Sequence, residues 1–200
     1  MSKYSKGTLA ILCASLLLAA AAGPGSARNI ELSNQSFRIT WAPLRFIAGE
    51  GEEICHVTLE GSFHSRTIAK SLESLIGFIT RAQVNRCDSP TTTGLGLPWH
   101  IRYAGFTGTL PTVTSIRVKL IDVSVRRDSF ASCLYRSTAA RPVLGSIAIA
   151  AGEATTFTPD LTTRLVLFEG GVACVGEFAL EGSGQVRQLN TSTRLRVRLI

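Results

Sequence analysis

Hydrophobic and polar residues alternate along much of the chain after residue 36. Phe37, Ile39 and Trp41, for example, are separated by polar residues. A period of two residues is typical of a β-strand with one buried face, because successive side chains point to opposite faces. Pro43 interrupts this first run, which predicts a bulge or an edge position at that point.

Further segments show the same alternation, namely 44–46, 55–60, 99–103, 116–125, 130–136, 146–150, 154–158, 163–168, 174–180 and 194–199. The pattern changes phase near Leu120, which predicts a bulge there. Residues 71–86 fit a helical face and a strand face, and their β-branched and aromatic residues together with Gly77 favour a strand. Residues 88–96 are rich in Ser, Thr, Gly and Pro, which predicts a loop.

These segments amount to about ten short strands separated by turns, without a convincing amphipathic helix. The sequence therefore predicts an all-β protein. An antiparallel β-sandwich with Greek-key or jelly-roll connections is the expected fold, since it buries one face of every strand.

The first 27 residues have the pattern of a secretory signal peptide. Lys3 and Lys6 precede an apolar run at 9–22, and small residues then allow cleavage after Ala22 or Ala27. The apolar run is shorter than the about 20 residues that cross a bilayer. We therefore expect a single secreted or envelope-associated domain, residues 28–200, without a transmembrane segment.

Four cysteines remain after export: Cys55, Cys87, Cys133 and Cys174. An even number of cysteines in an oxidising compartment predicts two disulfides. Three pairings are possible, and we favour Cys55–Cys87 with Cys133–Cys174, because each then closes one half of the chain. A zinc site is the alternative, but no C-x-x-C pair supports it.

Three stretches carry a resemblance to known proteins, namely Cys55-x-Val57-Thr58-Leu59-Glu60-Gly61-Ser62-Phe63-His64, Leu97-Pro98-Trp99-His100-Ile101-x-Tyr103 and Gly108-Thr109-Leu110-Pro111. They resemble uncharacterised secreted, β-rich proteins of high-GC bacteria over most of the mature chain. The resemblance implies an exported β-domain. It implies no activity and transfers no catalytic residue.

The charge of the chain is moderately basic. Removal of Lys3 and Lys6 with the signal peptide lowers the net charge from +7 to +5. Arginine outnumbers lysine 17 to 4, which favours a high-GC bacterial source. Such a charge is compatible with an anionic cell-wall polymer or glycan as partner, although we favour a solvated basic surface. The chain shows no interleaving of aromatic and basic residues, so a nucleic acid is not expected.

Histidines and carboxylates are the candidates for chemistry. His56, His64 and His100 would form a three-nitrogen metal site near Glu60 if their strands were neighbours, whereas structural histidines are the alternative. Glu60 and Glu181 are candidates for an acid–base pair of a glycosidase. No Gly-x-Ser-x-Gly motif is present.

Aromatic residues are candidates for binding. Trp41, Trp99, Tyr103 and Phe106 would form a stacking platform for sugars, or else pack in the core. Phe106 lies in a Gly-rich turn and is therefore the best candidate for an exposed ring.

Arg194, Arg196 and Arg198 share the polar face of the last strand. They are candidates for contact with an anionic polymer. Protection of an edge strand against unwanted pairing, or plain solvation, is the favoured alternative.

The sequence thus predicts a non-catalytic surface or envelope module without a cofactor. Binding of a carbohydrate or cell-wall polymer is the first alternative. A small secreted hydrolase that uses the histidines and a metal ion is the second.

Overall fold

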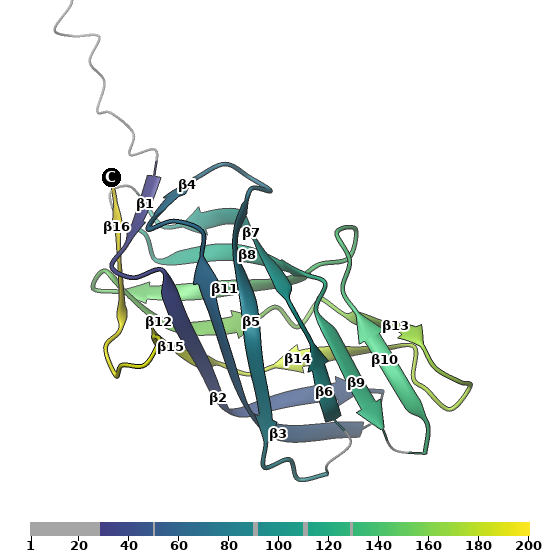
Figure 1. Cartoon of the computed structure of the whole chain (residues 1–200). Coiled ribbons are helices and arrows are strands. Elements are labelled where there is room, and N and C mark those ends of the chain that lie inside the picture. Colours follow the sequence, from purple (N-terminus) through teal and green to yellow (C-terminus); the bar gives the residue numbers. More distant parts are fainter. Residues whose placement is uncertain (1–28, 50, 90–91, 110–111, 129) are drawn as a thin grey trace, which may run out of the picture.

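A computed structural model of the chain describes residues 29–49, 51–89, 92–109, 112–128 and 130–200 (Figure 1). The predicted signal peptide lies outside these residues. All regular elements in the described part are strands, and all pairings are antiparallel. The strands are β1 (Asn29–Leu32), β2 (Ser36–Ala48), β3 (Gly51–Phe63), β4 (Thr67–Ala69), β5 (Leu75–Asn85), β6 (Thr92–Gly96), β7 (Trp99–Thr107), β8 (Ser115–Ile121), β9 (Ser124–Asp128), β10 (Ser132–Arg136), β11 (Val143–Ala150), β12 (Glu153–Pro159), β13 (Leu165–Glu169), β14 (Glu177–Glu181), β15 (Gly184–Gln188) and β16 (Leu195–Leu199).

Eight of these strands close into a barrel. Neighbours pair in the order β2, β3, β5, β7, β8, β11, β12 and β15. The last of them, β15, contacts both β12, through Thr156↔Gln185, and β2, through Gln185↔Thr40. These two pairings close the ring of strands.

The all-β, antiparallel prediction is confirmed, but the predicted sandwich of about ten strands is wrong. Alternation shows that one face of a strand is buried and does not show which strand lies beside it, so a sandwich and a barrel share the pattern. The sequence did not predict β1, β4, β6 and β15. Of these, β1 and β4 have only four and three residues, and β6 lies within residues 88–96, where the prediction of a loop is wrong. In addition, the segment 116–125 is two strands, separated by Asp122 at a positive φ of 61°.

Two smaller sheets extend the barrel. An end sheet consists of β4, β1 and β16 and joins the barrel through β12. A side sheet consists of β6, β9, β10, β13 and β14 and joins β2, where Ala179 pairs with Ile47. In Figure 1 the end sheet lies at the upper left, and β6, β9, β10 and β13 lie at the right.

Side chains fill the interior of the barrel. The Trp41 and Phe157 rings meet edge to face at 5.8 Å. Two voids of about 20 Å³ each remain, and their walls are apolar side chains. Each void is about the size of one water molecule. The interior therefore packs as a core and offers no room for a ligand.

Gly184 allows this packing, because a Cβ atom at this position would lie 2.5 Å from Cε2 of Trp41. We expect Gly184→Ala to lower the free energy of unfolding by about 1–3 kcal/mol through overpacking. Gly171→Ala is the control, since its Cβ would meet no atom within 4 Å. Urea unfolding of both variants tests this prediction, and equal stability of the two variants would contradict it.

The side sheet has its own aromatic core. The Tyr135 ring packs edge to face on the Phe178 ring, with 4.7 Å between the centroids. The Phe46 ring lies on Phe178 as well, at a centroid distance of 6.1 Å. Tyr135 and the barrel residue Tyr103 are both almost fully buried.

Burial raises the pKa of the Tyr103 and Tyr135 hydroxyls above the ordinary value of about 10. Their contribution to stability is therefore fully present below about pH 10 and is lost as the pH rises through the raised values. These are the only tyrosines of the chain after residue 27. We expect the tyrosinate absorbance of the folded chain to appear at higher pH than that of the urea-unfolded chain. Coincident titration curves would contradict this expectation.

Two disulfides are present, as predicted. Cys55 of β3 pairs with Cys87, which follows β5, and Cys133 of β10 pairs with Cys174 in the loop before β14. This is the pairing that the sequence favoured. Two disulfides fit an extracellular or otherwise oxidising environment. Within the described residues, no helix has the length and apolar character needed to cross a membrane.

Candidate functional site

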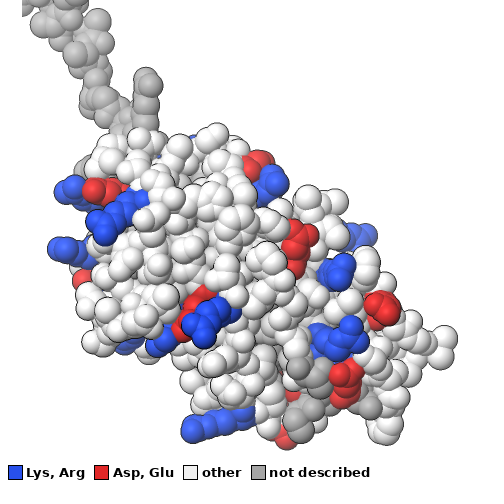
Figure 2. All heavy atoms as spheres, in the orientation of Figure 1, with Lys and Arg blue, Asp and Glu red and all other residues white. Residues whose placement is uncertain are grey.

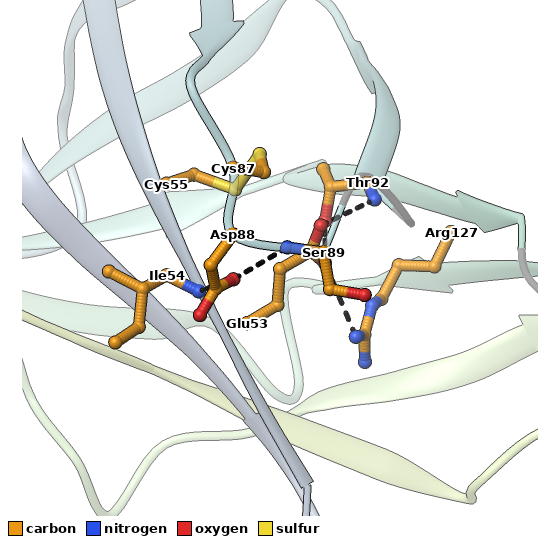
Figure 3. Close-up of polar contacts among 8 residues, drawn as sticks. All are labelled: Glu53, Ile54, Cys55, Cys87, Asp88, Ser89, Thr92 and Arg127. Carbon is orange, nitrogen blue, oxygen red and sulfur yellow. Dashed lines mark hydrogen bonds and ion pairs between the residues drawn. A yellow bond between two sulfur atoms is a disulfide. The ribbon is translucent and has the colours of Figure 1, made fainter.

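A buried carboxylate lies where the side sheet meets the barrel (Figure 3). Glu53 of β3 is 1% exposed. Its carboxylate accepts hydrogen bonds from the Thr92 backbone N–H at 3.0 Å and from the Thr92 hydroxyl at 2.8 Å. Arg127 Nη2 lies 3.3 Å from the same carboxylate. Because Thr92 and Arg127 are paired residues of β6 and β9, Glu53 ties the edge of the side sheet to β3.

The segment after β5 is fastened to the same part of β3. Asp88 Oδ1 accepts hydrogen bonds from the backbone N–H groups of Ile54 at 2.9 Å and Ser89 at 2.8 Å. The Asp88 N–H in turn donates to the Ile54 carbonyl at 3.1 Å. Together with the Cys55–Cys87 disulfide beside them, these bonds hold the connection between β5 and β6 against the start of β3 (Figure 3).

Glu53, Cys55 and Cys87 are close enough together to be considered as metal ligands. However, the two sulfur atoms are bonded to each other, and a thiolate is the form that ligates a metal. In the oxidised protein this cluster therefore holds elements together. Glu53 was not among the residues expected to be functional, although it is in phase with Cys55, Val57 and Leu59 on the inward face of β3.

The three histidines do not converge. His64 and His100 lie against the same ring, Phe78, at centroid distances of 4.9 and 5.0 Å. His56 lies eight positions before His64, in register with Asn85 of β5. His100 Nδ1 contacts Asp122 Oδ2 at 2.6 Å. The structure thus places a phenyl ring between two of the predicted ligands and leaves the third on another part of β3.

Glu60 and Glu181 each contact arginine. Arg38 Nη2 lies 2.6 Å from Glu60, and Arg81 Nη1 lies 3.6 Å from it. Arg45 Nη1 lies 3.1 Å from Glu181. Since a glycosidase needs two carboxylates that face one substrate, the separate ion pairs of these two do not support that chemistry.

The predicted stacking platform is largely inside the protein. Trp41, Trp99 and Tyr103 are each at most 3% exposed, and the Trp99 indole N–H donates to the Gly96 carbonyl at 2.6 Å. Phe106 is half-buried, with Lys70 Nζ at 5.3 Å from its ring centroid. Trp41 and Trp99 are buried because they occupy inward-facing positions of their strands, and side chains at these positions fill the barrel.

Arg194, Arg196 and Arg198 are all exposed, as expected for the outward face of β16. Arg194 contacts Glu153 at 3.6 Å. The edge-protection alternative is wrong, because β16 lies between β1 and β12 and the edges of the sheet are β4 and β6.

The end sheet forms a hollow beside these arginines. Its volume is about 490 Å³, and its walls include Arg66, Arg196, Arg198, Glu31 and Ser33. Figure 2 shows basic and acidic atoms side by side over this end of the molecule. The sequence identified Arg196 and Arg198 but gave no means of adding Arg66, which reaches the hollow from the connection before β4.

Glu31 and Arg198 form an ion pair across β1 and β16, between Oε2 and Nε. The hydrogen bond from Arg198 lowers the pKa of the Glu31 carboxyl, although the desolvation of the group opposes this shift. Arg66 also lowers this pKa through its charge. The hollow therefore contains three cations and one anion at neutral pH.

Comparisons with known proteins identify no relative: no protein-family model matches the chain, no curated protein matches its sequence, and no solved structure matches its fold. The function therefore has to be argued from the geometry alone.

Proposed function

We propose that the chain is a non-catalytic module that a bacterium exports to its surface or envelope. The observation that carries this proposal is the filled interior of the barrel, where the described side chains surround apolar voids of about 20 Å³ each. The interior of an eight-stranded barrel is just wide enough to be filled by side chains or to hold one small ligand, and here side chains fill it. The separated histidines and the arginine-paired carboxylates also favour a scaffold over an enzyme.

The export part of this proposal is tested by recovering the protein from the cells that make it. We expect it in the envelope or the medium, with cleavage after Ala22 or Ala27. Its two disulfides make the intact mass four hydrogens lower than that of the reduced chain. An uncleaved cytoplasmic protein with free thiols would contradict export.

Binding of an anionic cell-wall polymer or glycan is a second candidate, and the arginine-lined hollow of the end sheet favours it. The oxidised chain 28–200 is mixed with insoluble cell wall and with immobilised glycans. We expect retention that decreases from low to moderate salt, because salt screens exposed charges. Absence of retention on every material would contradict this function. We do not propose the histidine-dependent hydrolase, since no observation brings its three ligands together.

A further inference from the structure

We propose that the hollow formed by Arg66, Arg196, Arg198 and Glu31 binds a phosphate monoester group, and that Glu31 competes with this group for Arg198. The inference rests on the second candidate function, binding of an anionic envelope polymer, and names the group that the hollow recognises.

The backbone fixes two of the arginines around the end of β1. The Leu32 N–H donates to the Arg66 carbonyl at 2.7 Å. At the next residue, the Ser33 N–H donates to the Arg196 carbonyl at 3.0 Å, and the Arg196 N–H donates to the Ser33 hydroxyl at 3.0 Å. Arg198 follows two positions later on β16, and therefore on the same face as Arg196. Three guanidinium groups from two distant parts of the sequence thus border one hollow.

The charge of the hollow is not balanced from within. Among the described residues, Arg66 and Arg196 take part in no ion pair, whereas Arg198 contacts Glu31. Three arginines and one glutamate give a net charge of +2. Two arginines of β2 differ in this respect, because Arg38 contacts Glu60 and Arg45 contacts two carboxylates.

A dianion matches this excess charge. A phosphate monoester carries a charge of about −1.5 to −2 at neutral pH and three acceptor oxygens, whereas a carboxylate or a phosphate diester carries only one negative charge. Arginine suits such a group because its planar guanidinium donates two parallel hydrogen bonds. The volume of about 490 Å³ also leaves room for the sugar or glycerol that carries the phosphate.

The Arg198 guanidinium donates a hydrogen bond to the Glu31 carboxylate. A bound phosphate would have to share or displace this carboxylate, and it would be repelled by its charge. The lowered pKa keeps Glu31 ionised as the pH falls, so the competition persists below neutral pH. Removal of this one negative charge is therefore expected to strengthen the binding of the phosphate monoester. At a patch that only contacts solvent, the same removal would not favour one anion over the others.

Calorimetric titration with methyl phosphate, dimethyl phosphate and acetate tests the inference on the oxidised chain 28–200 at low salt. We expect methyl phosphate to bind more tightly than the two monoanions. Arg196→Gln should weaken its binding by about tenfold, as expected for the loss of one charge-assisted contact. Glu31→Gln should strengthen it by about threefold, since it removes a repulsion of surface magnitude.

Two control variants change the net charge equally at other places. Arg141→Gln alters an exposed arginine in the connection before β11, and Glu169→Gln alters an exposed glutamate at the end of β13. We expect neither to change the affinity for methyl phosphate. An equal response of Arg196→Gln and Arg141→Gln would show a general charge effect and overturn the site. Equal binding of acetate and methyl phosphate would overturn the phosphate assignment.

Cell-wall retention separates failure of this inference from failure of the proposed function. If the unmodified chain is retained and neither Arg66→Gln nor Arg196→Gln changes this retention, the hollow is overturned as the site. Polymer binding would then still stand. Absence of retention by the unmodified chain would overturn the polymer-binding function itself. Retention that both variants abolish, and that methyl phosphate displaces, would support the hollow and its ligand.

Discussion

Glu53→Ala is expected to lower the free energy of unfolding by about 3–5 kcal/mol, as found when one partner of a buried ion pair is removed. The substitution takes away the acceptor for both Thr92 hydrogen bonds and for the Arg127 contact, at a place where solvent does not reach the carboxylate. Unsatisfied buried donors cost far more than exposed ones, because water cannot replace the lost acceptor.

Urea unfolding measures this effect, and the neighbouring residue gives a matched control. Glu52 contacts Arg45 on the surface, where both side chains are about 40% exposed. Glu52→Ala is therefore expected to cost at most about 1 kcal/mol. Glu53→Gln should lie between the two, since its amide oxygen can still accept from Thr92. A cost below 1 kcal/mol for Glu53→Ala would show that the cluster does not fasten the side sheet.

Removal of either disulfide is expected to cost about 4 kcal/mol. The bridges close loops of similar length, with sequence separations of 32 and 41 residues, so loop entropy in the unfolded chain predicts nearly equal losses. The variants are Cys55→Ala with Cys87→Ala, and Cys133→Ala with Cys174→Ala. Urea unfolding under non-reducing conditions measures both losses, and a loss below 1 kcal/mol for either pair would contradict the prediction.

Hydrogen exchange should distinguish the two pairs of variants in the native state. Without Cys55–Cys87, the Ile54 and Thr92 amides should exchange faster, because the segment that carries Asp88 is no longer covalently held to β3. Without Cys133–Cys174, these amides should keep more of their protection, since that bridge joins β10 to the loop before β14 and leaves the segment of Asp88 covalently held to β3. The same exchange pattern in both variants would contradict this separation.

The sequence indicated the strands more reliably than their arrangement. Alternation in 37–41, 55–60 and 99–103 identified strands whose inward residues do line the core. The closure of the barrel depends on β15, which was not among the alternating segments expected from the sequence. A five-residue strand with two neighbours carries no local signal of its partners, so the barrel could not be distinguished from a sandwich.

The candidate sites show the same limit. Cysteine spacing favoured the pairing that the structure has, because each bridge closes a local part of the chain. Arg196 and Arg198 were visible as a stripe, since residues two apart on one strand share a face. Arg66 and Glu31 join them only through the pairing of β1 with β4 and with β16. The sequence did not indicate a role for Glu53, because a charged residue near the start of a strand is ordinarily exposed.

The hairpin of β2 and β3 has a mechanical consequence. Each strand has 13 residues and would span about 43 Å if straight, and the two run through the barrel wall into the region that bears the side sheet. The barrel and the side sheet are therefore joined by these two paired strands, whose register shifts once, between Trp41 and Leu44. If the end sheet holds a polymer, as proposed, these shared strands would set the distance between that polymer and a partner bound at the far tip of the side sheet.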